Sequence, residues 1–169
     1  MNLREGYAAT HHASLKWSAD HEKAVDKVAA SGLCDELGVL LWKVKYMSES
    51  WAYKKAREEL IKRHQERFFN EVDTLRSSVV DQCLHEFLSD KCKWCKGAKE
   101  MIVGERRVVC DACQGYGIRK YTDSDRAKYM KQSLGRIKSL QRQFNFLHDL
   151  IGTLDRKVNS MMCEQLERF

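Results

Sequence analysis

Apolar positions in the first half of the chain recur at steps of three or four residues, the spacing of one face of an α-helix. Over residues 33–46 they predict one helix that faces a core, with apolar positions Leu33, Leu37, Leu40, Leu41 and Val44. Over residues 49–88 a longer pattern fits either one helix or two, with apolar positions Ala52, Ala56, Leu60, Phe68, Val72, Leu75, Val79, Cys83 and Phe87. Both stretches indicate a helical body.

A shorter helix is predicted over residues 18–30. Charged and small residues alternate there around a modest apolar stripe of Ala24, Val25 and Val28, and Ser31-Gly32 ends the segment. Residues 1–17 are expected to form a flexible N-terminus.

The second half of the chain predicts two further helical stretches. Thr122-Asp123-Ser124-Asp125 has the pattern of a capping box, so a helix is expected over Asp123–Lys131, ending near Gln132-Ser133. A regular 3-4 pattern follows at Ile137, Leu140, Phe144, Leu147, Ile151, Leu154, Val158 and Met161. Because it covers only about three and a half heptads, a long helix that packs on the N-terminal helices is preferred over a coiled-coil seam.

Four cysteines form two Cys-x-x-Cys pairs, Cys92–Cys95 and Cys110–Cys113, which 14 residues separate. Each pair can hold one side of a metal ion, and two pairs complete the tetrahedron of thiolates that zinc accepts at ~2.3 Å per sulfur. Four cysteines also close the coordination sphere, so the sequence predicts one structural Zn²⁺ and no position for a catalytic water. His85 and His148 are spare ligands that this set makes unnecessary.

Each cysteine pair continues as Cys-x-x-Cys-x-Gly, with Gly97 and Gly115 in equivalent positions. A knuckle turn needs a residue that tolerates a positive φ there, so that backbone amides can approach the sulfurs. Met101-Ile102-Val103 and Arg107-Val108-Val109 flank Gly104-Glu105-Arg106 and predict a β-hairpin that folds one pair onto the other. Two redox-active dithiols or two disulfides are the alternatives, but no thioredoxin-like βαβ pattern surrounds either pair.

The composition favours a folded, helical protein. The chain has no proline and nine glycines, and 43% of its residues are apolar and 32% charged. Long helices can therefore run without obligatory breaks. Opposite charges at helical spacing, among Arg57, Glu58, Glu59, Lys62 and Arg63, are interpreted as a solvated face.

The N-terminal residues lack the apolar stretch of a secretory signal, so export is not expected. The longest apolar run, Val39-Leu40-Leu41-Trp42, is far shorter than the ~20 residues of a membrane span. Seven cysteines in a chain of this kind indicate a reducing cytoplasm, where paired cysteines bind metal. Cys34, Cys83 and Cys163 stand alone and are interpreted as small buried apolar side chains.

The net charge of +6 is unevenly distributed. Residues 1–90 sum to −2 and residues 148–169 to −1, whereas residues 91–113 sum to +3 and residues 114–147 to +6. The basic charge therefore lies in and just after the cysteine pairs, as expected of a face that binds a polyanion.

The order of these motifs resembles that of the Q-type late-gene antiterminators of lambdoid bacteriophages. The resemblance is clearest over residues 91–166 and is carried by the repeated Cys-x-x-Cys-x-Gly, then Tyr116-Gly117-Ile118-Arg119, then Thr122-Asp123-Ser124-Asp125-Arg126-Ala127 at a helix start. In that family a zinc module sits beside a helix-turn-helix that reads DNA overlapping the late promoter. The protein then loads onto paused RNA polymerase, which ignores terminators. The chain departs from the pattern at Gly97-Ala98, where a second glycine is expected.

The resemblance implies that Asp125–Lys131 is the first helix of the helix-turn-helix and that Leu134–His148 is its recognition helix. Helical geometry supports a DNA-binding face independently, because a core-facing Ile137 and Phe144 would place Lys138, Arg142 and Asn145 on the exposed side. Phosphate-contacting and base-reading side chains are expected at Arg119, Lys120, Arg126, Lys128, Lys131, Arg136, Lys138, Ser139, Gln141, Arg142 and Asn145. A solvated basic face on an ordinary helix is the alternative.

The predicted architecture is a mostly α fold, a helical bundle with an inserted Cys₄ zinc-ribbon-like β-hairpin module and a helix-turn-helix. Its expected parts are a flexible N-terminus (1–17), a helical body (18–90), a zinc module (91–118), and the helix-turn-helix with a C-terminal helix (119–169).

The predicted function is sequence-specific DNA binding and transcription antitermination in the cytoplasm of a bacterial host. Double-stranded promoter DNA and bacterial RNA polymerase holoenzyme are the expected partners. A zinc-containing regulator that never travels with polymerase is one alternative. A DnaJ-like chaperone module is another, although that region uses four Cys-x-x-Cys-x-Gly repeats and two zinc ions, against two repeats here. The sequence has no phosphate-binding glycine loop, nucleophile elbow or paired-histidine metal site, so neither catalysis nor a small-molecule substrate is expected.

Overall fold

The computed structural model describes residues 34–166, with side chains described as far as Met162. The described chain forms two compact units. The helical unit comprises residues 34–88 and 123–166, and the metal module comprises residues 89–122, which contain both cysteine pairs. The helix expected over residues 18–30 and the flexible segment expected over residues 1–17 lie outside the described residues.

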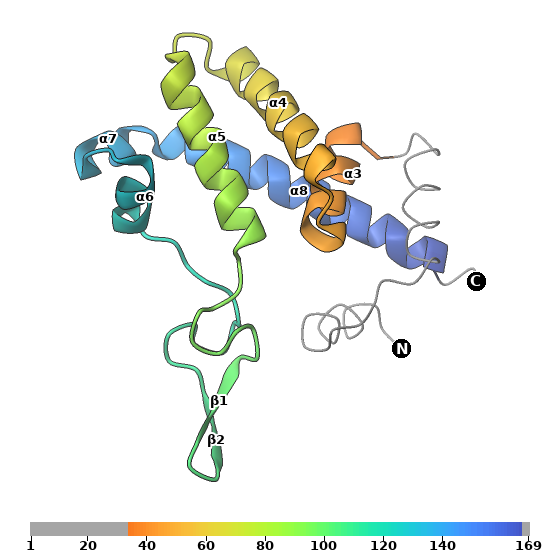
Figure 1. Ribbon diagram of the computed structural model, residues 1–169, viewed down its shortest axis with the longest axis vertical. Helices are drawn as coiled ribbons and strands as arrows, with labels where there is room; N and C mark the ends of the chain where they lie inside the picture. Colours follow the sequence, from red (N-terminus) through yellow and green to blue (C-terminus); the bar gives the residue numbers. More distant parts are fainter. Residues whose placement is uncertain (1–33, 167–169) are drawn as a thin grey trace. The chain divides into compact units, whose positions relative to one another are not determined.

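Short turns join the helices of the helical unit, except that residues 89–122 connect α5 to α6 (Figure 1). In chain order they are α3 (Glu36–Trp42), the π-helix η1 (Lys43–Met47), α4 (Ser50–Arg67), α5 (Asp73–Leu88), α6 (Asp123–Met130), α7 (Leu134–Ser139) and α8 (Gln141–Leu166). None of them is long and apolar enough to span a bilayer. The expectation of a mostly helical chain is confirmed for the described residues.

The apolar pattern over residues 49–88 resolves into two helices, α4 and α5. Helix α4 ends at Arg67, and the φ of −128° and ψ of 62° of the next residue, Phe68, are not helical. The buried guanidinium of Arg76 fixes the turn that follows, because it donates to the carbonyl oxygens of Glu71 at 2.7 Å and Phe68 at 3.5 Å and also pairs with Asp73. The guanidinium of Arg76 thus ties the turn between α4 and α5 to the first turn of α5.

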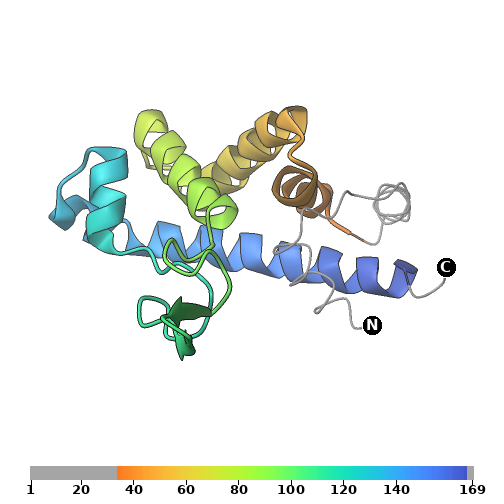
Figure 2. The same ribbon diagram turned by 60° about the horizontal axis from the view of Figure 1, so that its bottom comes forward.

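Helix α8 supplies one side of the core of the helical unit (Figure 2). Helices α3 and α5 both pack against it, and α4 packs against α3 and α5. The apolar positions expected in this stretch are buried, namely Phe144, Leu147, Ile151, Leu154 and Val158. The preferred interpretation, a long helix that packs on helices from the first half of the chain, is confirmed.

The expected pattern is wrong at its last position, because Met162 is buried with 0% exposure and Met161 is only partly buried. A 3-4 repeat averages 3.5 residues per turn, whereas an α-helix has 3.6, so the buried face drifts by about 20° per heptad. Met162 stands 18 residues after Phe144, which is five full turns of an α-helix, so it returns to the buried face, whereas Met161 lies about 100° away from it.

Gly38 lets α3 approach α8 closely. A Cβ atom at Gly38 would lie 3.1 Å from Val158 Cγ2 and 3.4 Å from Leu154 Cβ. One turn further along α3, the buried indole of Trp42 donates a hydrogen bond to Asn159 Oδ1 at 3.0 Å. The contact between the two helices therefore combines close packing with a satisfied polar group.

The segment over residues 134–148 is divided at Leu140, whose φ of −89° and ψ of 1° end helix α7. The Leu140 amide is shared between the carbonyl oxygens of Arg136 at 3.2 Å and Ile137 at 3.0 Å, and the Ser139 hydroxyl donates to the Arg136 carbonyl at 2.7 Å. Such shared and side-chain hydrogen bonds tighten the last turn and interrupt the helix. The expectation of one recognition helix over Leu134–His148 is corrected to a short α7 followed by α8.

A buried ion pair fastens α6 to α5. Arg126 donates to both carboxylate oxygens of Glu86 at 2.8 and 2.9 Å, and its guanidinium lies 4.5 Å from the centre of the Phe144 ring on α8. Gln82 and His148 also contact the Glu86 carboxylate. Burial by itself raises the pKa of Glu86, but the hydrogen bonds from Arg126, His148 and Gln82 outweigh it and lower that pKa to about 2. Glu86 therefore remains ionised inside the core.

Candidate metal centre and basic surface

The four paired cysteines converge in the metal module. Cys92, Cys95, Cys110 and Cys113 are buried, with at most 7% exposure, and their Sγ atoms all lie within 4.8 Å of one another. The Sγ atoms of Cys92 and Cys110 are 3.9 Å apart, and those of Cys95 and Cys113 are 3.6 Å apart. Four sulfurs at ~2.3 Å from a tetrahedral ion lie about 3.8 Å from one another. The cluster can therefore hold one metal ion.

The sulfurs are too far apart for disulfides, which need a bond of ~2.05 Å, and all four cysteines are free. The alternative of two disulfides is therefore absent from the metal module. Two local effects act on the thiols. Backbone amides of Cys95 and Trp94 lower the pKa of Cys92 to about 7, whereas burial raises the pKa of Cys110 to about 11. A bound cation would favour the thiolate form of all four, because it stabilises negative charge on sulfur.

The two cysteine knuckles, defined as residues 92–99 and 110–117, follow the same backbone path. Gly97 and Gly115 adopt φ values of +94° and +78°. This confirms the positive φ that the Cys-x-x-Cys-x-Gly motif predicts. The amide of Gly117 donates to the sulfur of Cys113 at 3.2 Å, an amide–sulfur contact of the expected kind.

Reciprocal hydrogen bonds hold the knuckles together. The amide of Cys92 donates to the carbonyl of Gly117, and the amide of Cys110 donates to the carbonyl of Lys99, both at 2.9 Å. The acceptor residues are equivalent and both have positive φ, +74° at Gly117 and +68° at Lys99. The first knuckle thus has a lysine with a glycine-like backbone where the second knuckle has Gly117.

A β-hairpin joins the knuckles, as predicted. Strands β1 (Glu100–Val103) and β2 (Arg106–Val109) pair antiparallel, with Met101 opposite Val108, and Gly104 turns between them at a φ of +63°. Because the hairpin returns the chain on itself, it places the second cysteine pair beside the first.

Substitutions at the two acceptor residues, Gly117 and Lys99, should shift metal affinity in opposite directions. In Gly117→Ala the new Cβ would lie 2.8 Å from the Gly97 carbonyl oxygen. Because of this clash and the positive φ, we expect the free energy of metal binding to weaken by roughly 2 kcal/mol. In Lys99→Gly the positive φ becomes unstrained, and we expect a gain of up to about 1 kcal/mol. Chelator competition measures both changes.

Gly104→Ala is the matched control for these variants. Gly104 also has a positive φ, but a Cβ there would meet nothing within 4 Å. Its effect should therefore be smaller than that of Gly117→Ala. Equal losses at Gly104 and Gly117, or weaker metal binding in Lys99→Gly, would contradict the assigned geometry.

The remaining cysteines and histidines of the described chain lie in the helical unit. Cys83 is buried, as predicted, and Cys34 is partly buried; the side chain of Cys163 lies outside the described residues. His85 stacks on Tyr129, with 4.8 Å between ring centres, and His148 contacts Glu86. Neither histidine belongs to the cysteine cluster.

Comparison of the chain with models of protein families, with curated proteins and with solved structures finds no match. Functional inference therefore rests on the residues of the sites themselves.

Most of the basic and polar residues expected at DNA lie on exposed positions of the helical unit. The side chains of Ile137, Leu140 and Phe144 are buried, whereas Lys138 and Arg142 are exposed. Further exposed members of the expected set are Lys128, Lys131, Arg136, Ser139, Gln141 and Asn145. The predicted division of α7 and the start of α8 into a buried and an exposed face is confirmed.

Three expected DNA contacts are placed differently. Arg119 and Lys120 belong to the metal module, where they lie 4.1 Å from the Tyr121 ring centre and 5.3 Å from the Tyr116 ring centre respectively. Arg126 belongs to the helical unit, but its side chain is only 11% exposed and is paired with Glu86. Arg126 therefore has a structural contact that the sequence analysis missed. The spacing of four residues between Arg126 and Met130, which would place both on the same side of the helix, was the one signal in the sequence that Arg126 faces the core.

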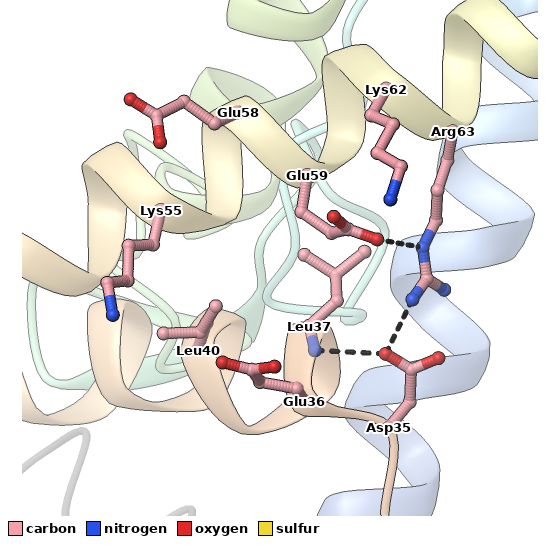
Figure 3. A pocket seen from close by; sticks show the side chains of 9 residues that line it. All are labelled: Asp35, Glu36, Leu37, Leu40, Lys55, Glu58, Glu59, Lys62 and Arg63. Carbon is pink, nitrogen blue, oxygen red and sulfur yellow. Dashed lines mark hydrogen bonds and ion pairs between the residues drawn. The ribbon is translucent and has the colours of Figure 1, made fainter.

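A hollow of about 750 Å³ lies beside α3 and α4 (Figure 3). Arg63 bridges its two sides, with hydrogen bonds to Asp35 at 2.8 Å and to Glu59 at 3.0 Å. The hollow is lined by Asp35, Glu36, Leu37, Leu40, Lys55, Glu58, Glu59, Lys62 and Arg63. These charges of both signs, paired in part at helical spacing, agree with the predicted solvated face on α4.

Proposed function

We propose that the protein is a sequence-specific DNA-binding transcription factor that loads onto promoter-proximally paused RNA polymerase and allows it to read through terminators. The observation that carries DNA binding is the exposed face of α7 and the first turns of α8. Lys138 on α7 and Arg142 and Asn145 at the start of α8 are exposed, whereas Ile137 and Phe144 are buried. Arginine, lysine and asparagine are the side-chain types that read base edges in the major groove.

The helix-turn-helix of this proposal consists of α6, residues 131–133 and α7 with the start of α8. Helices α6 and α7 pack against each other. Lys131 has a φ of +53° and Ser133 caps α7 by accepting from the Arg136 amide at 3.2 Å, so the turn is defined at both ends. Lys128, Lys131 and Arg136 are the phosphate contacts of this arrangement, although Arg136 also donates to Glu71 at 3.0 Å, and Arg126 holds α6 in place instead of touching DNA.

We assign the ion of the metal module to zinc. Four thiolates at tetrahedral spacing suit Zn²⁺ among the common cellular ions, and they leave no open coordination position. The role is structural: the ion holds the two knuckles and the hairpin in one conformation.

The polymerase step rests on the resemblance to the Q-type antiterminators and on charge. Residues 1–90 sum to −2, so they supply no net positive charge to attract DNA. Helices α3, α4 and α5 therefore suit a protein partner better than a nucleic acid, and we assign polymerase contact to this part of the chain.

Promoter binding should be electrostatic in large part and should depend on the proposed face. We expect Lys138→Ala or Arg142→Ala to weaken binding to a late-promoter fragment by about 1–3 kcal/mol each, with a steep fall in wild-type affinity as salt rises. Arg156→Ala, which removes an exposed arginine further along α8, is the matched control. Gel-shift titration at several salt concentrations measures all three.

Single-round transcription over a promoter, pause site and terminator tests the second half of the proposal. Wild-type protein should raise terminator readthrough, and Arg142→Ala should reduce it in proportion to lost occupancy. Promoter occupancy without any rise in readthrough would reduce the assignment to a DNA-binding regulator. Absence of promoter binding at low salt would contradict the proposal as a whole.

A further inference from the structure

The metal module leaves two large aromatic rings open to solvent. Trp94, between Cys92 and Cys95, is 74% exposed, and Tyr116, three residues after Cys113, is 63% exposed. The cysteines beside them are buried, so the backbone that carries each ring is fixed while the ring itself is free to contact a partner. Tryptophan is highly buried on average, so the exposure of Trp94 is unusual for this residue type.

Positive charge accompanies these rings. Lys93 and Lys96 are exposed on either side of Trp94, and Lys120 Nζ lies 5.3 Å from the Tyr116 ring centre. Over residues 89–122 the sequence has eight Lys and Arg against four Asp and Glu. An apolar protein partner would have to desolvate these cations, whereas a polyanion would pair with them.

We propose that the metal module binds single-stranded RNA, with bases stacked on Trp94 and Tyr116 and phosphates contacted by the neighbouring lysines. Exposed rings interleaved with cations are the arrangement by which proteins hold unpaired strands, because every base offers a face for stacking. A DNA duplex keeps those faces inside its stack, so it could use only the charges. RNA presents unpaired bases as a matter of course.

The fixed knuckles favour this binding. Reciprocal amide–carbonyl hydrogen bonds at 2.9 Å hold Cys92 to Gly117 and Cys110 to Lys99, so the backbone next to both rings is ordered before a ligand arrives. Pre-ordered contacts lose less conformational entropy on binding than flexible ones do. This inference goes beyond the proposed function, since it concerns a different unit and a different form of nucleic acid.

The test uses the full chain, loaded with metal, and a fluorescein-labelled uridine 12-mer in anisotropy titrations. Trp94→Ala and Tyr116→Ala should each weaken binding about tenfold or more, and Trp94→Phe should restore most of it because the ring is kept. Ile118→Ala is the matched control: Ile118 is 56% exposed in the same module but offers no ring for stacking. Metal content per chain, equal in all variants, establishes that the module stays folded.

Three results would overturn the proposal. Equal RNA binding by wild type and both alanine variants would show that charge alone attracts the strand and that the rings serve another partner, such as a protein. Equal binding of a 12-base-pair DNA duplex would exclude stacking. A single-stranded thymidine 12-mer that binds as tightly as the uridine 12-mer would overturn the assignment to RNA. Loss of promoter binding by Arg142→Ala with unchanged uridine 12-mer binding would separate this surface from the proposed DNA-binding face.

Discussion

Cys110→Ser should release the metal ion and unfold residues 89–122 while the helical unit keeps its structure. Cys110 is fully buried, and its sulfur lies 3.9 Å from that of Cys92. The buried cluster of the described module consists of the four cysteines, with Met101 packed against them. No apolar core remains there to hold the fold once the ion is lost, and structural zinc binding is worth about 10–16 kcal/mol in small modules.

Elemental analysis and hydrogen exchange measure this result. Wild-type protein should contain one zinc ion per chain, and the variant should contain none. Amide protection should disappear over residues 89–122 and persist in α5 and α8. Cys34→Ser is the matched control, because Cys34 lies in the helical unit and should leave metal content unchanged. A stoichiometry near two ions, or wild-type protein without metal and with fully reactive thiols, would contradict the centre.

The cysteine cluster could be predicted from the sequence because its determinants are local. The spacing inside each Cys-x-x-Cys pair places two thiols on one side of an ion, and the glycine that follows marks the positive φ of the knuckle. The apolar pattern between the pairs specifies a hairpin short enough to join them. Each element needs only neighbours within about ten residues, so periodicity and spacing suffice.

The roles of single charged residues could not be predicted in the same way. Arg126 has the charge and side-chain type of a DNA contact. Its partner Glu86 stands 40 positions earlier in the sequence, so the pairing has no local signal. Similarly, the break at Leu140 depends on the Ser139 hydroxyl turning back to the Arg136 carbonyl, which competes with a continuous helix that the apolar pattern favours equally. Long-range pairing and competing local hydrogen bonds leave no periodic signal.

Arg126→Met should destabilise the helical unit by about 3–5 kcal/mol, because it leaves the Glu86 carboxylate buried without its guanidinium. The Glu86 side chain is only 6% exposed, so water cannot replace the lost partner. Arg57→Met is the matched control: it breaks the Arg57–Asp81 pair, whose side chains are 33% and 31% exposed. The Arg57–Asp81 pair is only partly buried, so its loss should approach the ~0–1 kcal/mol of a surface pair. Urea unfolding of both variants should therefore give clearly different losses.

The stability of the helical unit should depend on pH through the ionisation of Glu86. Its pKa falls from 4.5 to about 2 on folding, so its ionisation stabilises the fold fully above pH 4.5. This contribution, about 3 kcal/mol, is lost as the pH falls towards 2. The double variant Glu86→Leu/Arg126→Met carries neither charge, so it should recover much of the stability that Arg126→Met loses and should show a weaker dependence on pH over this range. Urea midpoints measured between pH 5 and pH 2.5 for the wild type and the double variant decide the point. Parallel curves for the two proteins would mean that the buried carboxylate does not stabilise the helical unit in this way.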